Sequence, residues 1–348
     1  MKVSVVVTTF RPGYIDTIAE SLSRQTMSQD EWELILVDDL FEKRRVAVAD
    51  FVRGRIKNFR HIPPRELKDY SSNCMTLNTG IVHSRGELVY FSNDYLYPSP
   101  GCLQRHWQIY TKYGPKVIIH GPLIDAIVAS GRSVWRGTPA QPQNIVEKNE
   151  VVTALSFSPP IPVPLKDGFN QMTPENFISV FKEPFIPPQF LSLLPDWRTG
   201  ATLGQPIDTD LYENGSIHPW SWWWAGRNTS APLEMLLEIN GFDESFDGRH
   251  GGADGDIGYR LMHIGGGDVW REDAIERTAR TSRYLVDAQA PAFELTHPVK
   301  KGVILSETER LGKVEEARAE KPIPNDYSLR EERERILKEE NHGTARTN

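Results

Sequence analysis

The sequence predicts an α/β protein whose Rossmann-like, mostly parallel sheet is flanked by helices. Residues 3–10 form a nearly continuous apolar run rich in Val and Thr, which is typical of a strand buried on both faces of a sheet. Residues 14–25 follow with apolar side chains at helical spacing. Strands and helices then alternate in units of about 30 residues, which is the pattern of βαβ crossovers.

The remaining elements of the first third of the chain continue this alternation. Strands are expected at residues 33–37, 59–62, 88–91 and 116–121, and helices at 46–52, 71–83 and 103–113. After the third of these strands, Pro98 and Pro100 are expected to prevent another strand, because proline cannot donate a backbone hydrogen bond. Further helices are expected at 231–239, with Pro232 at the start, and from near Asp254 onward.

Length and composition are those of an ordinary globular protein. The chain has 348 residues, of which 39% are hydrophobic and 25% charged, enough for one large domain or two smaller ones. Its net charge of −7 gives no electrostatic reason to expect nucleic acid as a partner. The two cysteines lack metal or redox spacing, and no run of 18 apolar residues suggests a transmembrane segment. A cytoplasmic location is therefore expected.

Two predicted strands end in acidic residues. Asp38 and Asp39 follow the strand at 33–37, and Asp94 follows the strand at 88–91. The carboxyl ends of parallel strands lie along one edge of a sheet, where open α/β proteins bind ligands, so these carboxylates are expected to converge on one cleft. A solvated turn with an Asx hydrogen bond is the alternative for Asp94. No Gly-rich phosphate loop follows the first strand, which disfavours an NAD enzyme or a P-loop ATPase.

A second pair of carboxylates lies in the first turn of the helix expected near residue 254. Asp254 and Asp256 follow Gly251 and Gly252. They could simply complement the helix dipole, whereas a carboxylate beside a Gly-rich loop could act as a general base.

Aromatic residues are frequent ahead of this helix. Trp222 and Trp224 fall on one face of a predicted strand. Packing is the commoner role for any single Trp, but indole rings also stack on the apolar faces of sugars. Residues 139–219 are rich in Pro and have few clean periods, so a docked insertion or lid is expected there, with disorder as the alternative.

Six short motifs occur in a fixed order along the chain. They are S-x-x-x-Q-T at 21–26, V-D-D at 37–39, N-x-G through G-E at 78–87, N-D-Y at 93–95, N-G-F-D-E at 240–244 and G-G-A-D-G-D at 251–256. In this order they resemble the family 2 glycosyltransferases, which are inverting enzymes of the GT-A fold. The resemblance covers residues 3–125 and 220–300.

The resemblance implies a role for individual residues. A nucleotide-sugar donor would contact Thr9, Phe10, Arg11, Asp39, Asn78, Asn93 and Asp94. A divalent cation, Mn²⁺ or Mg²⁺, would be bound by Asp94 and His297. Asp254 would be the base that deprotonates the acceptor hydroxyl, and Trp222, Trp224 and Asp256 are expected in the acceptor site.

The sequence departs from the family pattern around the expected cation. Asn93 and Tyr95 flank Asp94 where many relatives carry further acids, and Ala253 replaces the usual Glu before the base. An Asn oxygen can ligate Mg²⁺ or Mn²⁺ but contributes no charge. Weak cation binding, or a smaller dependence on metal, is therefore expected.

The resemblance also divides the chain into four sections. These are the nucleotide-sugar half at 1–125, the Pro-rich insertion or lid at 126–219, the acceptor-binding and catalytic half at 220–300, and a charged, largely helical C-terminal tail at 301–348 that could mediate oligomerisation.

The expected function is inverting transfer of a sugar from a nucleotide sugar, taken to be a UDP-sugar, to a hydroxyl of a glycan, protein or small molecule. One alternative is a catalytically silent module that binds a sugar nucleotide or a glycan on the same fold. Another is a nucleotidyltransferase, which the lack of a basic Gly-rich loop after the first strand disfavours.

Overall fold

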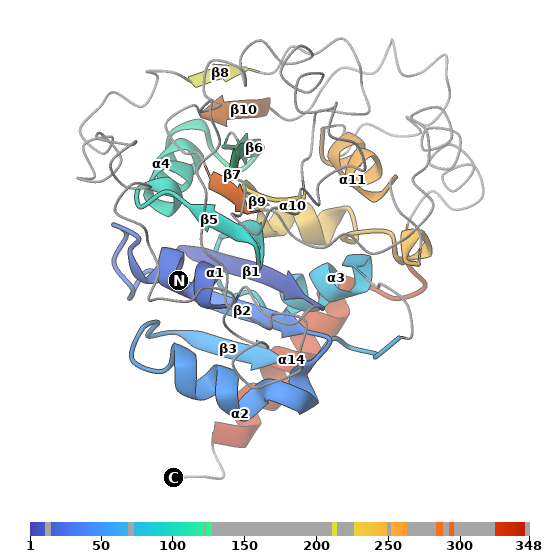
Figure 1. The fold of residues 1–348 in the computed structure, drawn as a ribbon. Coiled ribbons are helices and arrows are strands. Elements are labelled where there is room, and N and C mark those ends of the chain that lie inside the picture. The colour runs from blue at the N-terminus through green and yellow to red at the C-terminus, as the bar shows by residue number, and fades with distance from the viewer. Residues whose placement is uncertain are drawn as a thin grey trace, which may run out of the picture.

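Helices cover both faces of a central β-sheet (Figure 1). The computed structural model describes residues 1–10, 15–68, 73–121, 123–126, 211–213, 226–248, 252–262, 283–287, 292–295 and 324–344. The predicted fold class, an α/β protein with a mostly parallel sheet flanked by helices, is confirmed.

Strands and helices alternate through the described part of the first 121 residues as predicted, except that β5 follows β4 directly. The strands are β1 (Val3–Thr9), β2 (Trp32–Asp38), β3 (Phe59–Ile62), β4 (Leu88–Asn93), β5 (Leu96–Pro98) and β6 (Val117–His120). The helices are α1 (Ile15–Ser23), α2 (Phe41–Val52), α3 (Asn73–His83) and α4 (Cys102–Tyr113). Later strands are β7 (Leu123–Ala126), β8 (Leu211–Glu213), β9 (Thr229–Pro232), β10 (Arg283–Asp287) and β11 (Ala292–Leu295). Later helices are α10 (Leu233–Glu238), the 3₁₀ turn η2 (Glu244–Phe246), α11 (Ala253–Met262) and α14 (Leu329–Thr344).

Within the described residues, eight strands form the central sheet in the order β3-β2-β1-β4-β9-β6-β10-β8. Strand β1 pairs in parallel with β2 and β4, β2 with β3, and β6 with β10, whereas β9 is antiparallel to both β4 and β6. In this register Thr9 lies opposite Asp38, and Thr8 lies opposite Asn93. The carboxyl ends of β1, β2 and β4 therefore form one edge, where a ligand site is expected in an open α/β sheet.

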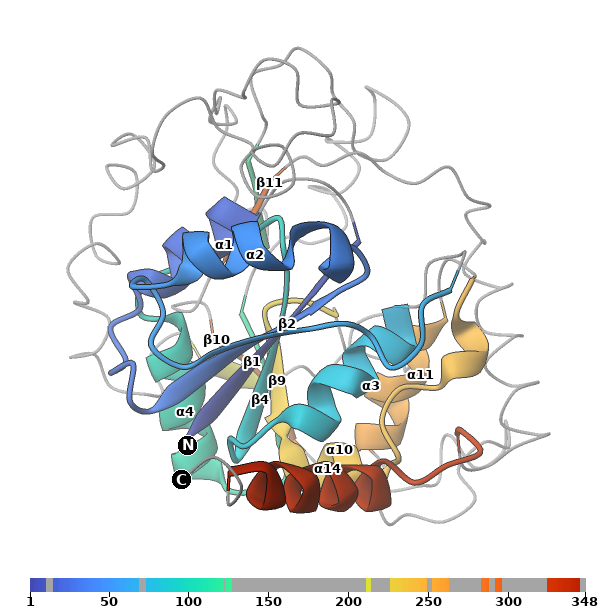
Figure 2. The same cartoon turned by 90° about the horizontal axis from the view of Figure 1, so that it is seen from below.

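Alternate residues of β1 point into two different cores. Val5 and Val7 pack with apolar side chains from α1, α2 and α4, whereas Val6 packs with side chains from α3, α10, α11 and α14. Figure 2 shows α1 and α2 on one face of the sheet, with α3, α10 and α14 on the other. All seven residues of β1 are buried, which explains why its sequence is continuously apolar rather than alternating.

Helix α3 approaches β1 closely because Gly80 lies at the contact. A Cβ at Gly80 would come within 2.3 Å of Cγ1 of Val6, which is well inside van der Waals contact. The glycine of the N-x-G motif thus allows the helix to pack on the strand.

Two sequence predictions are corrected by the structure. Pro98 does not prevent a strand, because β5 ends at Pro98 and pairs antiparallel with β11 in a separate three-stranded sheet. Strand β5 lies at the edge of that sheet, where the missing N–H is tolerated. The helix expected from residue 231 begins at Leu233 instead, since Ala231 and Pro232 complete β9 and pair with β4.

The C-terminal helix α14 packs on the same chain. Leu329 at its start is fully buried, and Ile336 packs against the core of α3, α10 and α11. Its exposed face carries an i,i+4 ion pair, with Arg335 and Glu339 at 2.7 Å.

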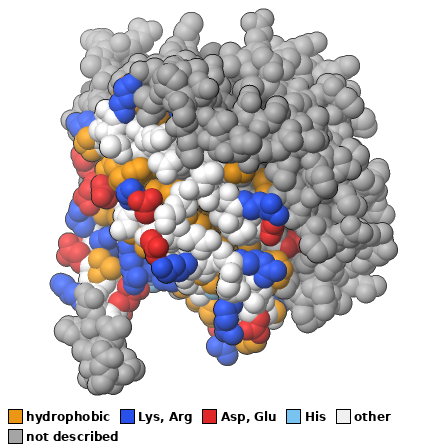
Figure 3. Space-filling model, turned by 90° about the vertical axis from the view of Figure 1, so that its left-hand side faces the viewer, with side chains coloured by type: hydrophobic (Ala, Val, Ile, Leu, Met, Phe, Trp, Pro, Cys, Tyr) orange, Lys and Arg blue, Asp and Glu red, His pale blue; other side chains and the backbone are white. Residues whose placement is uncertain are grey.

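The described surface carries charges of both signs. In Figure 3, Lys and Arg side chains are interspersed with Asp and Glu side chains. Of the helices in the described part of the chain, none combines the length and apolar character that a membrane span requires.

Candidate active site

The carboxyl ends of β1 and β4 are joined by a buried hydrogen bond. Oγ1 of Thr9, the last residue of β1, donates to Oδ2 of Asp94 at 2.6 Å, and each residue is only 1% exposed. Asp94 directly follows Asn93, which ends β4. The Asp94 carboxylate is therefore buried and held at the sheet edge. The alternative, a solvated turn, does not describe it.

The two acidic residues at the end of β2, Asp38 and Asp39, lie in different environments. Asp38 is fully buried and accepts two hydrogen bonds of 2.7 Å from the Arg44 guanidinium and one of 2.8 Å from the backbone N–H of Leu40. Nε2 of His61 also lies 2.8 Å from its carboxylate. Burial alone would raise the pKa of Asp38, but hydrogen bonds from His61 and Arg44 outweigh it and lower the pKa. Asp38 is thus part of the interior.

Asp39 lies on the other side of Thr9 and is only partly buried. Its backbone N–H donates to the carbonyl oxygen of Thr9 at 3.0 Å. The structure therefore brings Thr9, Asp39 and Asp94 together at one edge, as the strand ends predicted, and partly buried Phe10 continues from Thr9. Arg11 lies outside the described residues.

The two unusual neighbours of Asp94 bond to each other. Nδ2 of Asn93 donates to the hydroxyl of Tyr95 at 2.6 Å, and Tyr95 is 6% exposed. No group of three or more His, Cys, Asp or Glu that could hold a metal ion occurs within the residues that the structure describes. Asp94 and Asn93 supply one carboxylate and one amide oxygen, a set that fits a cation completed by substrate phosphates and water. His297, the other predicted ligand, lies outside the described residues.

Asn78 is placed differently from its prediction. The side chain is 1% exposed and lies between α3 and the loop before η2, where Phe242 N donates to its Oδ1 at 2.8 Å. Its Nδ2 donates to the Phe242 carbonyl at 2.9 Å and to Glu244 at 3.0 Å. Asn78 thus ties the helix to the loop that leads to α11, which favours a structural role over the expected donor contact.

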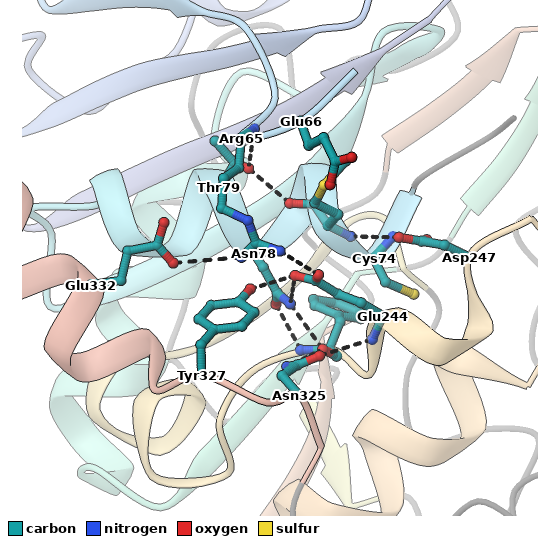
Figure 4. A network of polar contacts seen from close by, with 12 residues as sticks. Arg65, Glu66, Cys74, Asn78, Thr79, Glu244, Asp247, Asn325, Tyr327 and Glu332 are labelled. Carbon is teal, nitrogen blue, oxygen red and sulfur yellow. Dashed lines mark hydrogen bonds and ion pairs between the residues drawn. The ribbon is translucent and has the colours of Figure 1, made fainter. Parts of the chain in front are cut away.

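Glu244 is the centre of a polar network that joins three distant segments (Figure 4). Its carboxylate accepts hydrogen bonds from Asn78, from Arg65 at 2.6 Å and from the hydroxyl of Tyr327. The Arg65 guanidinium also lies 4.0 Å from the centre of the Tyr327 ring. The segment before α14 is thereby attached to the loop that precedes α11.

Asp247 caps helix α3 from outside the helix. Its carboxylate accepts from the backbone N–H groups of Cys74 at 2.7 Å and Met75 at 3.1 Å, in the first turn of α3. Burial raises the pKa of Asp247 to about 6 despite these two hydrogen bonds. Asp247 and Glu244 thus both hold the loop at 240–248 against α3.

Asp254 is exposed in the first turn of α11 and lies beside Gly226. Gly226 has a φ of +65°, and a Cβ added to it would fall 2.8 Å from Oδ1 of Asp254. The absence of a side chain at residue 226 therefore makes room for the exposed Asp254 carboxylate.

Asp256 is placed in the interior, contrary to its expected contact with an acceptor. It is fully buried, and its Oδ2 accepts hydrogen bonds of 3.0 Å and 2.5 Å from Arg260. Arg260 in turn donates to the carbonyl oxygen of Ile239 at 2.7 Å. Asp256 thus anchors α11, while Trp222 and Trp224 lie outside the described residues.

Sequence reasoning missed Arg44, Glu244 and Asp247. Glu244 belongs to the N-G-F-D-E motif, but the motif does not indicate that its side chain bonds to Arg65, Asn78 and Tyr327. Arg44 follows Asp38 by six residues, and its contact with Thr9 spans 35 residues, so no local pattern indicates it.

The fold defines the class of protein. The chain is similar to the crystal structure of GalNAc-T7 with UDP, GalNAc and Mn2+, with a TM-score of 0.52 and 11% sequence identity over 91% of this chain and 48% of that chain. It is also similar to S. aureus TarS residues 1–349 in complex with UDP-GlcNAc, with a TM-score of 0.48 and 14% identity over 90% of this chain and 64% of that chain. The likeness to GalNAc-T7, together with the sheet topology, shows the GT-A fold, as predicted.

A family match adds to the fold. Residues 4–145 match the model of glycosyl transferase family 2. The resemblance inferred from the ordered motifs is thereby confirmed. A search of curated proteins found no match. The chain spans 64% of the length of the TarS fragment and 48% of GalNAc-T7, less than two thirds of either.

Proposed function

We propose that the protein is an inverting glycosyltransferase that transfers a sugar from a UDP-sugar to an acceptor hydroxyl, with Asp254 as the general base. The observation that carries the proposal is the edge where Asp39 and Asp94 flank Thr9, within a family 2 domain. This is the edge of an open α/β sheet at which ligands bind. The UDP in the GalNAc-T7 structure, which has the same fold, supports a uridine nucleotide as donor.

The exposure of Asp254 supports its role as the general base. Asp254 is exposed on α11, so an acceptor hydroxyl can reach its carboxylate. As the hydroxyl oxygen forms a bond to the anomeric carbon, the bond from that carbon to the diphosphate breaks on the opposite face of the sugar. Asp254 takes the hydroxyl proton and UDP leaves with the electron pair, which inverts the anomeric configuration.

Asp94 and Asn93 would hold a divalent cation at the diphosphate end of the donor. Such a cation neutralises the charge that develops on the leaving diphosphate. The Mn2+ in the GalNAc-T7 structure supports this assignment. Since these residues bring only one carboxylate, we expect the cation to bind more tightly with UDP present than without it.

A screen of UDP-sugars, with and without Mn²⁺ or Mg²⁺, tests the proposal. Wild-type protein is expected to release UDP when a suitable acceptor is present. Asp254→Asn should abolish transfer while leaving the dissociation constant of UDP unchanged, because residue 254 acts on the acceptor. Asp50→Asn is the matched control: this exposed aspartate lies on α2, and we expect full transfer. Wild-type transfer rates in Asp254→Asn would rule out the base.

A catalytically silent binding module is the second candidate. The hydrogen bond between Asn93 and Tyr95, at positions where relatives carry acids, favours it. Under this hypothesis, UDP or a UDP-sugar would raise the melting temperature of the protein, but no UDP would be released with any acceptor. Transfer by the wild-type protein that Asp254→Asn removes would exclude it.

A further inference from the structure

A continuous chain of buried polar contacts runs across the carboxyl ends of four strands. It begins at Asp94 after β4, passes through Thr9 of β1 and Arg44 of α2, and ends at Asp38 of β2 and His61 of β3. The side chains of Arg44 and Asp38 have no exposed area. Arg44 contacts both Asp38 and Thr9, and Thr9 is the residue that donates to Asp94.

The Thr9 hydroxyl has a defined orientation in this chain. A hydroxyl has one proton to donate, and here that proton is directed at Oδ2 of Asp94, 2.6 Å away. Nη2 of Arg44 donates to the same Thr9 oxygen from 3.0 Å. Because an arginine can only donate, it fixes the hydroxyl as the donor toward Asp94.

Arg44 is itself held rigidly. Its Nε and Nη2 donate to the two oxygens of Asp38, both at 2.7 Å, so the planar guanidinium is bound at two points. His61 and the N–H of Leu40 complete the shell of Asp38. The charge of Arg44 is thus compensated, and its contact with Thr9 is an additional hydrogen bond that this ion pair does not require. A lysine could not make both contacts, since its ammonium lacks the planar fork.

We propose that Arg44 is a positioning residue of the donor site, which sets the Asp94 carboxylate through the Thr9 hydroxyl to receive the cation and diphosphate of a UDP-sugar. This inference rests on the proposed function and adds a residue outside the six motifs. The competing explanation is that Arg44 only ties α2 to the sheet.

Substitutions along the chain of contacts separate these two explanations. Thr9→Val removes the hydroxyl while keeping the side-chain shape, and Thr9→Ser retains it. Arg44→Lys loses the planar guanidinium but keeps a positive charge beside Asp38. Because that charge remains, the buried carboxylate stays paired, whereas Arg44→Met would leave it unpaired. The readouts are the dissociation constant of UDP with Mn²⁺, the KM of the donor and of the acceptor, and the melting temperature. Arg60→Met is the matched control, because Arg60 pairs with Glu33 at 2.7 Å at the opposite end of β2.

Thr9→Val and Arg44→Lys should each weaken binding of UDP with Mn²⁺ about tenfold, the effect of losing one hydrogen bond to a charged group. The double variant should bind UDP with Mn²⁺ as tightly as the single variant that has the lower affinity. Both substitutions break the same connection, so their effects should not add. Thr9→Ser should bind within about twofold of wild type, and the KM of the acceptor should not change. Arg60→Met should lower the melting temperature without changing UDP affinity.

Wild-type affinity for UDP with Mn²⁺ in folded Thr9→Val and Arg44→Lys would overturn the inference and leave Arg44 with a purely structural role. Additive losses in the double variant would also overturn it. A wild-type protein that binds no UDP would instead overturn the proposed function, and the inference with it.

Discussion

Asn78 and Phe242 exchange two hydrogen bonds across the junction between α3 and the loop that leads to α11. The amide N–H of Phe242 donates to Oδ1 of Asn78 at 2.8 Å, and Nδ2 of Asn78 returns a bond of 2.9 Å to the Phe242 carbonyl. Both residues are buried. The side chain of Asn78 therefore satisfies a buried peptide group that no helix or strand pairs, which is a structural task and not a donor contact.

Asn78→Ala should therefore destabilise the protein without weakening donor binding. The substitution removes the acceptor of the buried Phe242 N–H, whereas the Phe242 carbonyl keeps the hydrogen bond of 2.9 Å from Asn325. We expect a cost of about 2 kcal/mol in the free energy of unfolding. Urea denaturation would measure this loss, and UDP titration of the folded variant would measure affinity. Asn78→Asp, which keeps the acceptor for Phe242 but cannot donate, should also lose stability. Weakened UDP binding at unchanged stability would instead support the original prediction for Asn78.

The attachment of the C-terminal segment depends on Tyr327. Its hydroxyl bonds to Glu244, while its ring lies under the Arg65 guanidinium at 4.0 Å. Tyr327→Phe keeps the ring contact and removes only the hydrogen bond, so we expect the free energy of unfolding to fall by about 1–2 kcal/mol. The control is Arg335→Gln on α14, the helix that follows Tyr327. It breaks an exposed ion pair and should lower the free energy of unfolding by less than about 0.5 kcal/mol. Equal effects of the two substitutions in urea denaturation would contradict a stabilising role for the Tyr327 network.

Asp247 should make stability depend on pH in the acidic range. Burial raises its pKa from 3.8 to about 6 in the folded protein, so the folded state holds this proton more tightly than the unfolded state. The stability that Asp247 contributes is thus present below pH 3.8 and is lost as the pH rises through 6.

Asp247→Asn cannot titrate and isolates this contribution. The melting temperature of the variant minus that of the wild type should increase between pH 4 and 6 and remain level above pH 7. Because only the difference is compared, other titrating groups cancel. A difference that is constant across this range would show that Asp247 has an ordinary pKa.

The sequence predicted what depends on local patterns and failed where distant segments meet. The apolar runs located β1, β2 and β4, because a strand covered on both faces must be largely apolar. The structural contact of Asn78 was not foreseen because its partner Phe242 is 164 residues away. A polar residue in a motif looks the same in sequence whether it faces a ligand or a buried peptide group. Asp256 and Asp254 share one helical turn, yet one is fully buried and the other exposed. Only the packing of α11 decides which carboxylate is accessible.

Gly226→Ala should impair catalysis by displacing the Asp254 carboxylate. The added Cβ would lie 2.8 Å from Oδ1 of Asp254, and the backbone at residue 226 has a φ of +65° that side chains disfavour. Gly54→Ala provides the control, because Gly54 has a φ of +80° but no atom within 4 Å of its added Cβ. The two substitutions thus impose similar backbone strain, and only one disturbs Asp254. We expect Gly226→Ala to lower kcat by about tenfold to a hundredfold, since small displacements of a catalytic group are costly, with UDP affinity unchanged. Gly54→Ala should retain wild-type kcat, and equal kcat values in the two variants would show that Gly226 does not position Asp254.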